Sequence, residues 1–159
     1  MFLHYHSLNV FSRSVARFRF SVSDSASRSK EAHDMTYLFL KSYLLLIAVG
    51  IGLRTGGLKR CYEIARNSKM NQVADGLRVP YERICRAIDL ACVFYPTTVL
   101  CLQRSIAGVA VLRAYGWPAE FVTGCSIGTF EDHAWIEING TVVNDKAYIH
   151  EMYQVLDRC

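Results

Sequence analysis

The sequence lacks the patterns that usually mark metal-binding, secreted and nucleic-acid-binding proteins. None of its six cysteines belongs to a CxxC pair and its five histidines are not at zinc-finger spacing, so we expect no structural metal and no cofactor. The cysteines show no small disulfide framework, which predicts reduced thiols in a cytoplasmic protein. The 18 Lys and Arg against 14 Asp and Glu form no basic block, and this argues against nucleic acid as a partner.

A secretory signal and an uninterrupted membrane span are also missing. No charged-then-apolar pattern begins at Met1, as a secretory signal requires. The most hydrophobic segment, residues 37–53, is interrupted by Lys41 and leaves about a dozen uncharged residues, whereas a span needs about 20. We therefore predict a packed helix. The alternative is peripheral membrane contact through residues 37–53, favoured by the basic residues that follow them.

The length of 159 residues, 52% of them hydrophobic, predicts a single domain with a sizeable core. Residues 1–34 differ from the rest because they are rich in serine and arginine. We expect them to be a disordered extension, or translation assigned upstream of a natural start at Met35, with a targeting segment as the alternative. The predicted domain is thus 35–159.

Hydrophobic periodicity and turn residues predict an α+β fold, with N-terminal helices followed by a further helix packed on a small antiparallel sheet. The expected helices are 37–53, 58–67, 81–94 and one running from a cap at Thr97 or Thr98 to about residue 115, where Gly116 ends it. The expected strands are 119–124, 132–138 and 141–145, with a turn at 125–131 and a tail at 148–158 that packs back. Asn139-Gly140 is a strong hairpin signal.

Cys101 is the candidate nucleophile. Capping at Thr98 places it in the first turn of its helix, where unpaired backbone N–H groups and the helix dipole stabilise a thiolate. Cys85 and Cys92, seven residues apart on one helix face, are predicted to be small core residues instead. A cysteine on a helix is usually structural, so Cys101 gains weight only together with a base and a carboxylate.

His133 and Asp145 are the candidate base and orienting carboxylate. His133 is the one histidine inside a predicted strand, and Asp145 ends the next strand. A two-residue Asn139-Gly140 turn pairs residue 134 with 145, so that Asp145 faces away from the imidazole. A three-residue loop with a bulge at Gly140 pairs 133 with 145 instead. The catalytic hypothesis therefore predicts the bulged hairpin.

Three segments carry a resemblance to a known family: Cys101-Leu102-Gln103-Arg104-Ser105-Ile106-Ala107, Arg113-Ala114-Tyr115-Gly116-Trp117-Pro118-Ala119 and His133-Ala134-Trp135-Ile136-Glu137. They resemble the lasso-peptide maturation proteases, the transglutaminase-like B-proteins that remove leader peptides from ribosomally made precursors. Val142-Val143-Asn144-Asp145 fits the same pattern, and the resemblance is best over roughly residues 80–158.

The resemblance implies a papain-like α+β fold with Cys101 as nucleophile, His133 as base and Asp145 as its orienter. It also implies the precursor peptide as substrate, a separate leader-recognition protein and an ATP-dependent ring-closing enzyme. Papain-type enzymes place a glutamine in the oxyanion site, but none precedes Cys101 at that spacing, and we interpret Gln103 as structural. Two alternatives stay open: another acyltransferase or amidase of this fold, and a non-catalytic membrane-associated adaptor organised by residues 37–53.

Overall fold

The computed structural model describes residues 9–74, 76–126, 128 and 131–159, with side chains from Ala32 onward. Its contacts divide the chain into two units, Met1–Thr36 and Tyr37–Cys159. In the first unit residues 9–34 are helical, where we expected an extension without fixed structure. Neither Gly nor Pro occurs before Gly50, so nothing interrupts backbone hydrogen bonding there. That residues 1–34 stand apart from the domain stays a prediction.

The element order agrees with the predicted α+β class, which is confirmed. The helices and strands are α1 (Asn9–Asn67), α2 (Tyr81–Val93), α3 (Cys101–Ala114), β1 (Ala119–Ser126), β2 (Asp132–Ile138), β3 (Thr141–Val142), α4 (Ile149–Met152) and β4 (Tyr153–Arg158). The strands form one sheet in the order β3-β2-β1-β4, and every neighbouring pair is antiparallel. The turn predicted over 125–131 includes residues outside the described part of the chain.

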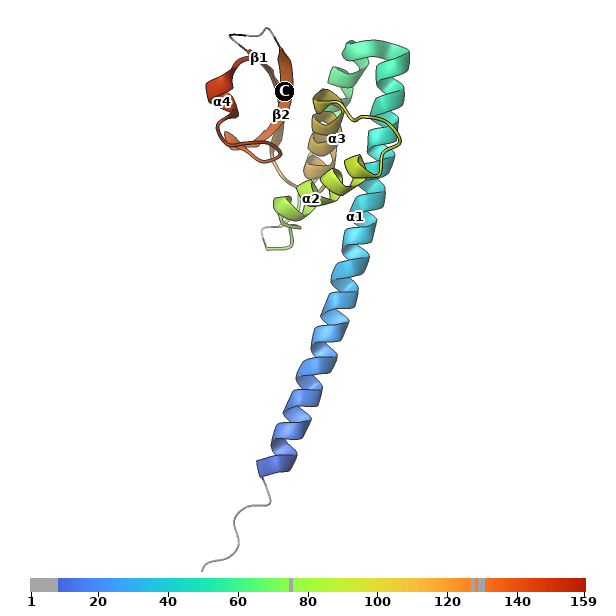
Figure 1. The fold of residues 1–159 in the computed structure, drawn as a ribbon, viewed down its shortest axis with the longest axis vertical. Helices are drawn as coiled ribbons and strands as arrows, with labels where there is room; N and C mark the ends of the chain where they lie inside the picture. The colour runs from blue at the N-terminus through green and yellow to red at the C-terminus, as the bar shows by residue number, and fades with distance from the viewer. Residues whose placement is uncertain (1–8, 75, 127, 129–130) are drawn as a thin grey trace, which may run out of the picture. The chain divides into compact units, whose positions relative to one another are not determined.

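Within the second unit, α3 packs against one face of the sheet (Figure 1). Its apolar side chains Ile106, Val109 and Leu112 are fully buried, as their spacing predicts. Gly108 lets the helix approach closely, since a Cβ added there would lie 2.4 Å from Cδ1 of Ile136 on β2. The helix that carries Cys101 is thus held directly against the strand that carries His133.

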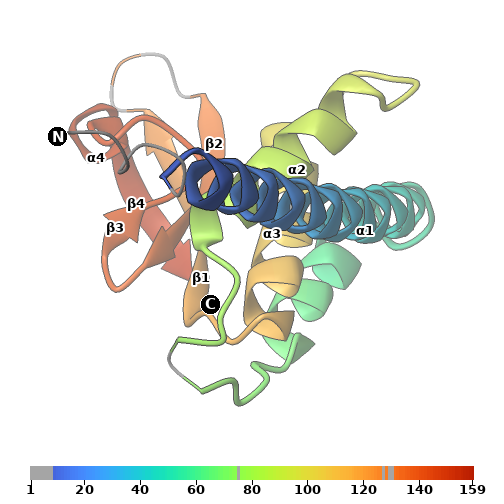
Figure 2. The ribbon, with the colours of Figure 1, turned by 90° about the horizontal axis from the view of Figure 1, so that it is seen from below.

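The other face of the sheet has a smaller core. Val122, Trp135 and Ile149 are buried there, and Tyr153 and Val155 pack against them. Figure 2 shows α4 and β4 on the opposite side of β1 and β2 from α2 and α3. The predicted tail therefore supplies an edge strand, whose side chains alternate between half-buried and exposed.

Glycines lie at the kink of α1 and at the end of α3, whereas no threonine caps the start of α3. The kink inside α1 lies at Gly57, with φ 63°, between the helices predicted over 37–53 and 58–67. Gly116 ends α3 at φ 84° as predicted. The predicted threonine cap is wrong: α3 begins at Cys101, with Leu100 at the cap position and no side-chain cap hydrogen bond. The chain between Pro96 and Leu100 stays non-helical, so both threonines lie too early to cap.

Candidate functional site

Cys101 is the first residue of α3, and it is half-buried with a free thiol. The helix is fixed behind it by Gln103, whose Nε2 donates to the carbonyl oxygen of Leu46 on α1 at 2.8 Å. Because its side-chain amide is buried and hydrogen-bonded to α1, the structural interpretation of Gln103 is confirmed. The backbone N–H groups of the first turn of α3 have no partner within the helix, as at any helix start.

Unlike Cys101, none of the five other cysteines begins a helix. Burial is the first cause that raises the pKa of each of these thiols: Cys61, Cys85, Cys92, Cys125 and Cys159. For Cys85, buried in α2 as predicted, the pKa is raised to about 11. Cys92 is half-buried and not in the core. At neutral pH these thiols are protonated and therefore poor nucleophiles.

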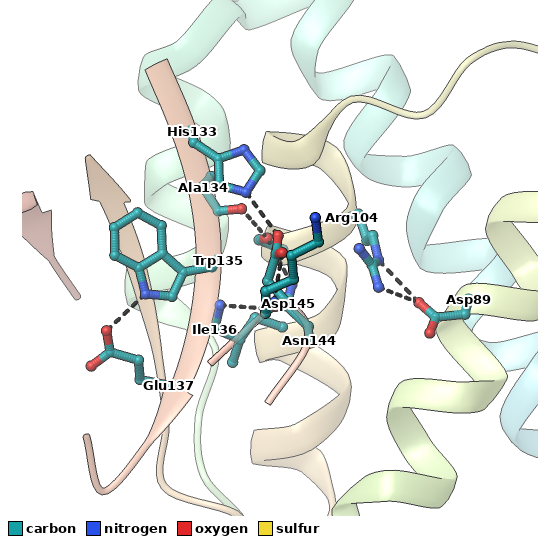
Figure 3. A network of polar contacts seen from close by, with 11 residues as sticks. Asp89, Arg104, His133, Ala134, Trp135, Ile136, Glu137, Asn144 and Asp145 are labelled. Atoms are coloured by element: carbon teal, nitrogen blue, oxygen red, sulfur yellow. Dashed lines mark hydrogen bonds and ion pairs between the residues drawn. The ribbon is translucent and has the colours of Figure 1, made fainter. Parts of the chain in front are cut away.

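His133 and Asp145 are in direct contact. The imidazole Nε2 lies 2.8 Å from Oδ2 of Asp145, and the two side chains are 22% and 21% exposed (Figure 3). The ring is also bordered by Trp135, with centroids 6.2 Å apart and planes nearly parallel, and by Tyr153 at 5.1 Å. These contacts restrict the imidazole to one orientation while leaving it partly accessible.

The environment of Asp145 favours its ionised form. Burial raises the pKa of this carboxyl, but hydrogen bonds from His133 and from the backbone N–H of Lys146 lower it, and so do the charges of His133 and Arg104. The net result is a pKa below the ordinary value. An ionised Asp145 accepts from Nε2–H of the imidazole, which leaves Nδ1 as the nitrogen that can take up a proton.

The hairpin brings this pair together by a different route from the predicted one. Ile138 pairs with Thr141, so the turn has two residues and the predicted bulge at Gly140 is wrong. Asn139 and Gly140 both have positive φ, at 51° and 76°, as a type I′ turn requires. The predicted strand 141–145 is also too long, because β3 ends at Val142.

After Val142 the side chain of Asn144 replaces the backbone as the hydrogen-bond acceptor for β2. The backbone N–H of Val143 still donates to the carbonyl of Ile136, but the N–H of Ile136 donates to Oδ1 of Asn144 at 2.7 Å and not to a backbone carbonyl. The chain thereby leaves the sheet register before Asp145. Because Asp145 is outside the strand, the alternation of side chains between the two faces of the sheet no longer fixes its direction. It therefore reaches His133, although the two-residue turn was expected to separate them.

Ser105 and Asn144 join the elements of the site and were missed in the sequence. The Ser105 hydroxyl donates to the carbonyl of Ala134 at 3.0 Å and accepts from Nδ2 of Asn144 at 3.1 Å. Ser105 is 1% exposed. The one available signal was a lone serine within the apolar face of α3, followed far along the chain by an asparagine beside the candidate carboxylate.

A second polar cluster lies on the other side of β2. Glu137 has no exposed surface, accepts from Nε1 of Trp135 at 2.7 Å and is hydrogen-bonded by Nη1 of Arg158 on β4. Burial raises the pKa of this carboxyl, but the hydrogen bonds from Arg158 and Trp135 and the nearby charges lower it further than burial raises it. The cluster ties β2 to the edge strand β4.

In the described part of the chain, no three His, Cys, Asp or Glu side chains are grouped so that they could hold a metal ion. No curated protein and no solved structure matches the chain. The model of the transglutaminase-like superfamily matches residues 44–158, which include Cys101, His133 and Asp145. Because that match covers well over half of the sequence, the chain belongs to the transglutaminase-like superfamily.

Proposed function

We propose that the chain is a cysteine peptidase in which Cys101 attacks, His133 acts as general base and acid, and Asp145 orients the imidazole. The observation that carries the proposal is the 2.8 Å contact between His133 and Asp145 beside the helix that begins at Cys101. Superfamily membership supports acyl-transfer chemistry at a cysteine, and the contact supports His133 and Asp145 as its base and orienting carboxylate.

The packing of α3 on β2 supports the place of Cys101 in this arrangement. Gly108 faces Ile136, and one turn earlier Ser105 bonds the carbonyl of Ala134, so helix and strand advance in the same direction. One further turn back along α3 is Cys101, displaced by about 6 Å from Ser105. One residue back along β2 is His133. Cys101 and His133 therefore belong to the same end of the contact between α3 and β2, which supports their proposed roles.

The reaction follows from the ionisation of the pair. Nδ1 of His133 takes the thiol proton of Cys101, and the thiolate attacks the scissile carbonyl to form a tetrahedral intermediate. The C–N bond breaks as the imidazolium returns the proton to the leaving amine, leaving a thioester. Water, deprotonated by His133, then hydrolyses the thioester. The proposed oxyanion donors are N–H groups of the first turn of α3, and each such donor contributes roughly 3 kcal/mol to catalysis.

The substrate is proposed from the sequence motifs. Their resemblance to lasso-peptide maturation proteases supports removal of the leader from a ribosomally made precursor in the cytoplasm. It supports two partners, a separate leader-recognition protein and an ATP-dependent ring-closing enzyme that acts on the released core.

The test is cleavage of a precursor peptide by the purified chain with its leader-recognition partner, followed by mass spectrometry. We expect Cys101→Ala and His133→Ala to lose cleavage by at least a thousandfold while retaining the wild-type unfolding transition. Cys92→Ala is the matched control, since it removes another half-buried thiol and should cleave normally. Cleavage by a contaminant-free Cys101→Ala protein at the wild-type rate would refute the proposal.

The same assay separates the alternatives. A transglutaminase or amidase would use the same three residues, but an added amine would appear in the product mass as an amide. A non-catalytic adaptor would give no thioester, and a thiol-directed probe would label Cys101 no faster than Cys92.

A further inference from the structure

The part of α1 in the second unit has two apolar faces, and one of them is buried in the core of that unit. Leu38, Leu46 and Val49 are 2%, 0% and 0% exposed. The amide of Gln103 bonds the Leu46 carbonyl from α3. In the part of the chain that the structure describes, one helix, Ala32–Asn67, is long and apolar enough to cross a membrane by length and composition. Its inner face is nevertheless core of the domain, so the helix cannot span a bilayer without unfolding it.

The outer face carries large apolar side chains, and we call it the apolar stripe. It consists of Tyr37, Leu40, Leu44 and Ile51, which are 58%, 52%, 64% and 55% exposed. Their spacings of three, four and seven residues place them along one side of a helix. From Tyr37 to Ile51 the stripe runs for about 21 Å. Exposed apolar stripes of this extent usually mark an interaction site.

The charges around the apolar stripe indicate what covers it. No Asp or Glu occurs between Met35 and Tyr62, while this segment contains Lys41, Arg54, Lys59 and Arg60. The last three are exposed and follow the stripe in the sequence. A second copy of the helix would bring like charges together, which disfavours self-association. An acidic surface with an apolar layer beneath it complements both features.

We propose that the chain binds peripherally to anionic lipid membranes through the apolar stripe. The aliphatic side chains enter the boundary between headgroups and acyl chains, and the basic side chains contact the lipid phosphates and carboxylates. The domain itself takes the place of the polar face of a free amphipathic helix. This proposal is independent of the peptidase proposal, because none of its residues belongs to the catalytic site.

Flotation of the full chain with lipid vesicles tests it. We expect co-flotation with vesicles of phosphatidylcholine containing phosphatidylserine, at least tenfold weaker binding to phosphatidylcholine alone, and weakening in 0.5 M salt. The Leu44→Glu/Ile51→Glu variant should bind at least tenfold more weakly. Lys59→Gln/Arg60→Gln should weaken binding about 25-fold, at roughly fivefold per charge.

The matched control is Leu77→Glu/Leu156→Glu, which adds the same charge at two other exposed leucines, 80% and 64% exposed, and should bind as the wild type does. Equal binding by the two glutamate variants, or no flotation of the wild type, would overturn the proposal. Sedimentation analysis identifies the rival occupant. A dimer that Leu44→Glu/Ile51→Glu converts to a monomer, without vesicle binding by the wild type, would assign the stripe to a second copy.

Discussion

Single residues decide how the candidate site is assembled. Asp145 reaches His133 because Asn144 takes over a backbone position in the sheet: its Oδ1 accepts from the Ile136 N–H, and its Nδ2 donates to Ser105. Asn144 therefore ends the backbone pairing of β3 with β2 and joins α3 to the loop after β3. The next residue, Asp145, can then contact the imidazole. Removing it should disturb the relation between the pair and the helix that carries Cys101.

We predict that Asn144→Ala lowers kcat/KM for precursor cleavage at least tenfold, mainly through kcat, because the imidazole is no longer held in a productive orientation. The free energy of unfolding should fall by roughly 1–3 kcal/mol, since two buried polar partners lose a hydrogen bond. Steady-state kinetics and urea unfolding measure the two effects. Asn71→Ala is the control, because Asn71 also makes a side-chain-to-backbone bond, to Ala114, but away from the site.

If Asn144 were only structural, kcat would be restored in proportion to folded protein once the variant is stabilised by lower temperature. A variant that is fully folded and fully active would contradict the positioning role.

At the scale of elements, β1 is the strand that holds the sheet together. It pairs with β2 along seven residues and with β4 on its other edge, where the register shifts between Thr123 and Gly124. At this irregularity a Cβ on Gly124 would lie 2.8 Å from the carbonyl oxygen of Gln154 and 2.8 Å from Cη2 of Trp135. The glycine thus permits β4 and the Trp135 ring to approach from two sides.

We predict that Gly124→Ala lowers the free energy of unfolding by about 1–3 kcal/mol, because neither a backbone carbonyl nor a buried indole can move away at little cost. Chemical denaturation provides the measurement. Gly128→Ala is the control, since an added Cβ there meets no atom within 4 Å. Unchanged stability of Gly124→Ala would mean that β4 is not held against β1 as described.

For the second unit as a whole, the buried carboxylate of Glu137 joins its central strand to its last one. Its oxygens bind the indole N–H of Trp135 and the guanidinium of Arg158, and His150 Nε2 lies 3.6 Å away. Arg158 also lies 3.7 Å from Glu120 on β1. All six cysteines are free, so non-covalent contacts such as these hold the C-terminal strand in place.

We predict that Glu137→Gln lowers the free energy of unfolding at pH 7 by roughly 1–3 kcal/mol. The pKa of Glu137 is below its ordinary value in the folded protein, so the unfolded state binds a proton first as pH falls. The advantage of the wild type is therefore complete above the ordinary pKa and is lost as pH falls through the folded one. Urea unfolding between pH 3 and pH 7 measures this difference, and a pH-independent difference would contradict it.

The sequence by itself determined the class of fold, most helices, and the residues that carry the proposed chemistry. These depend on local signals: periodicity defined α2 and α3, glycines marked the kink in α1 and the end of α3, and Asn139-Gly140 marked the hairpin. Local backbone preferences act over a few residues, so they can be read from neighbours in the chain.

Only the tertiary structure decided how the candidate site closes. The bulged hairpin that the catalytic hypothesis predicted was wrong, yet His133 and Asp145 still meet, because Asn144 bonds both a strand and a helix that are distant in sequence. The burial of Glu137 likewise depends on Arg158, 21 residues away. Such contacts are absent from local patterns, since their free energy arises only when remote segments are packed together.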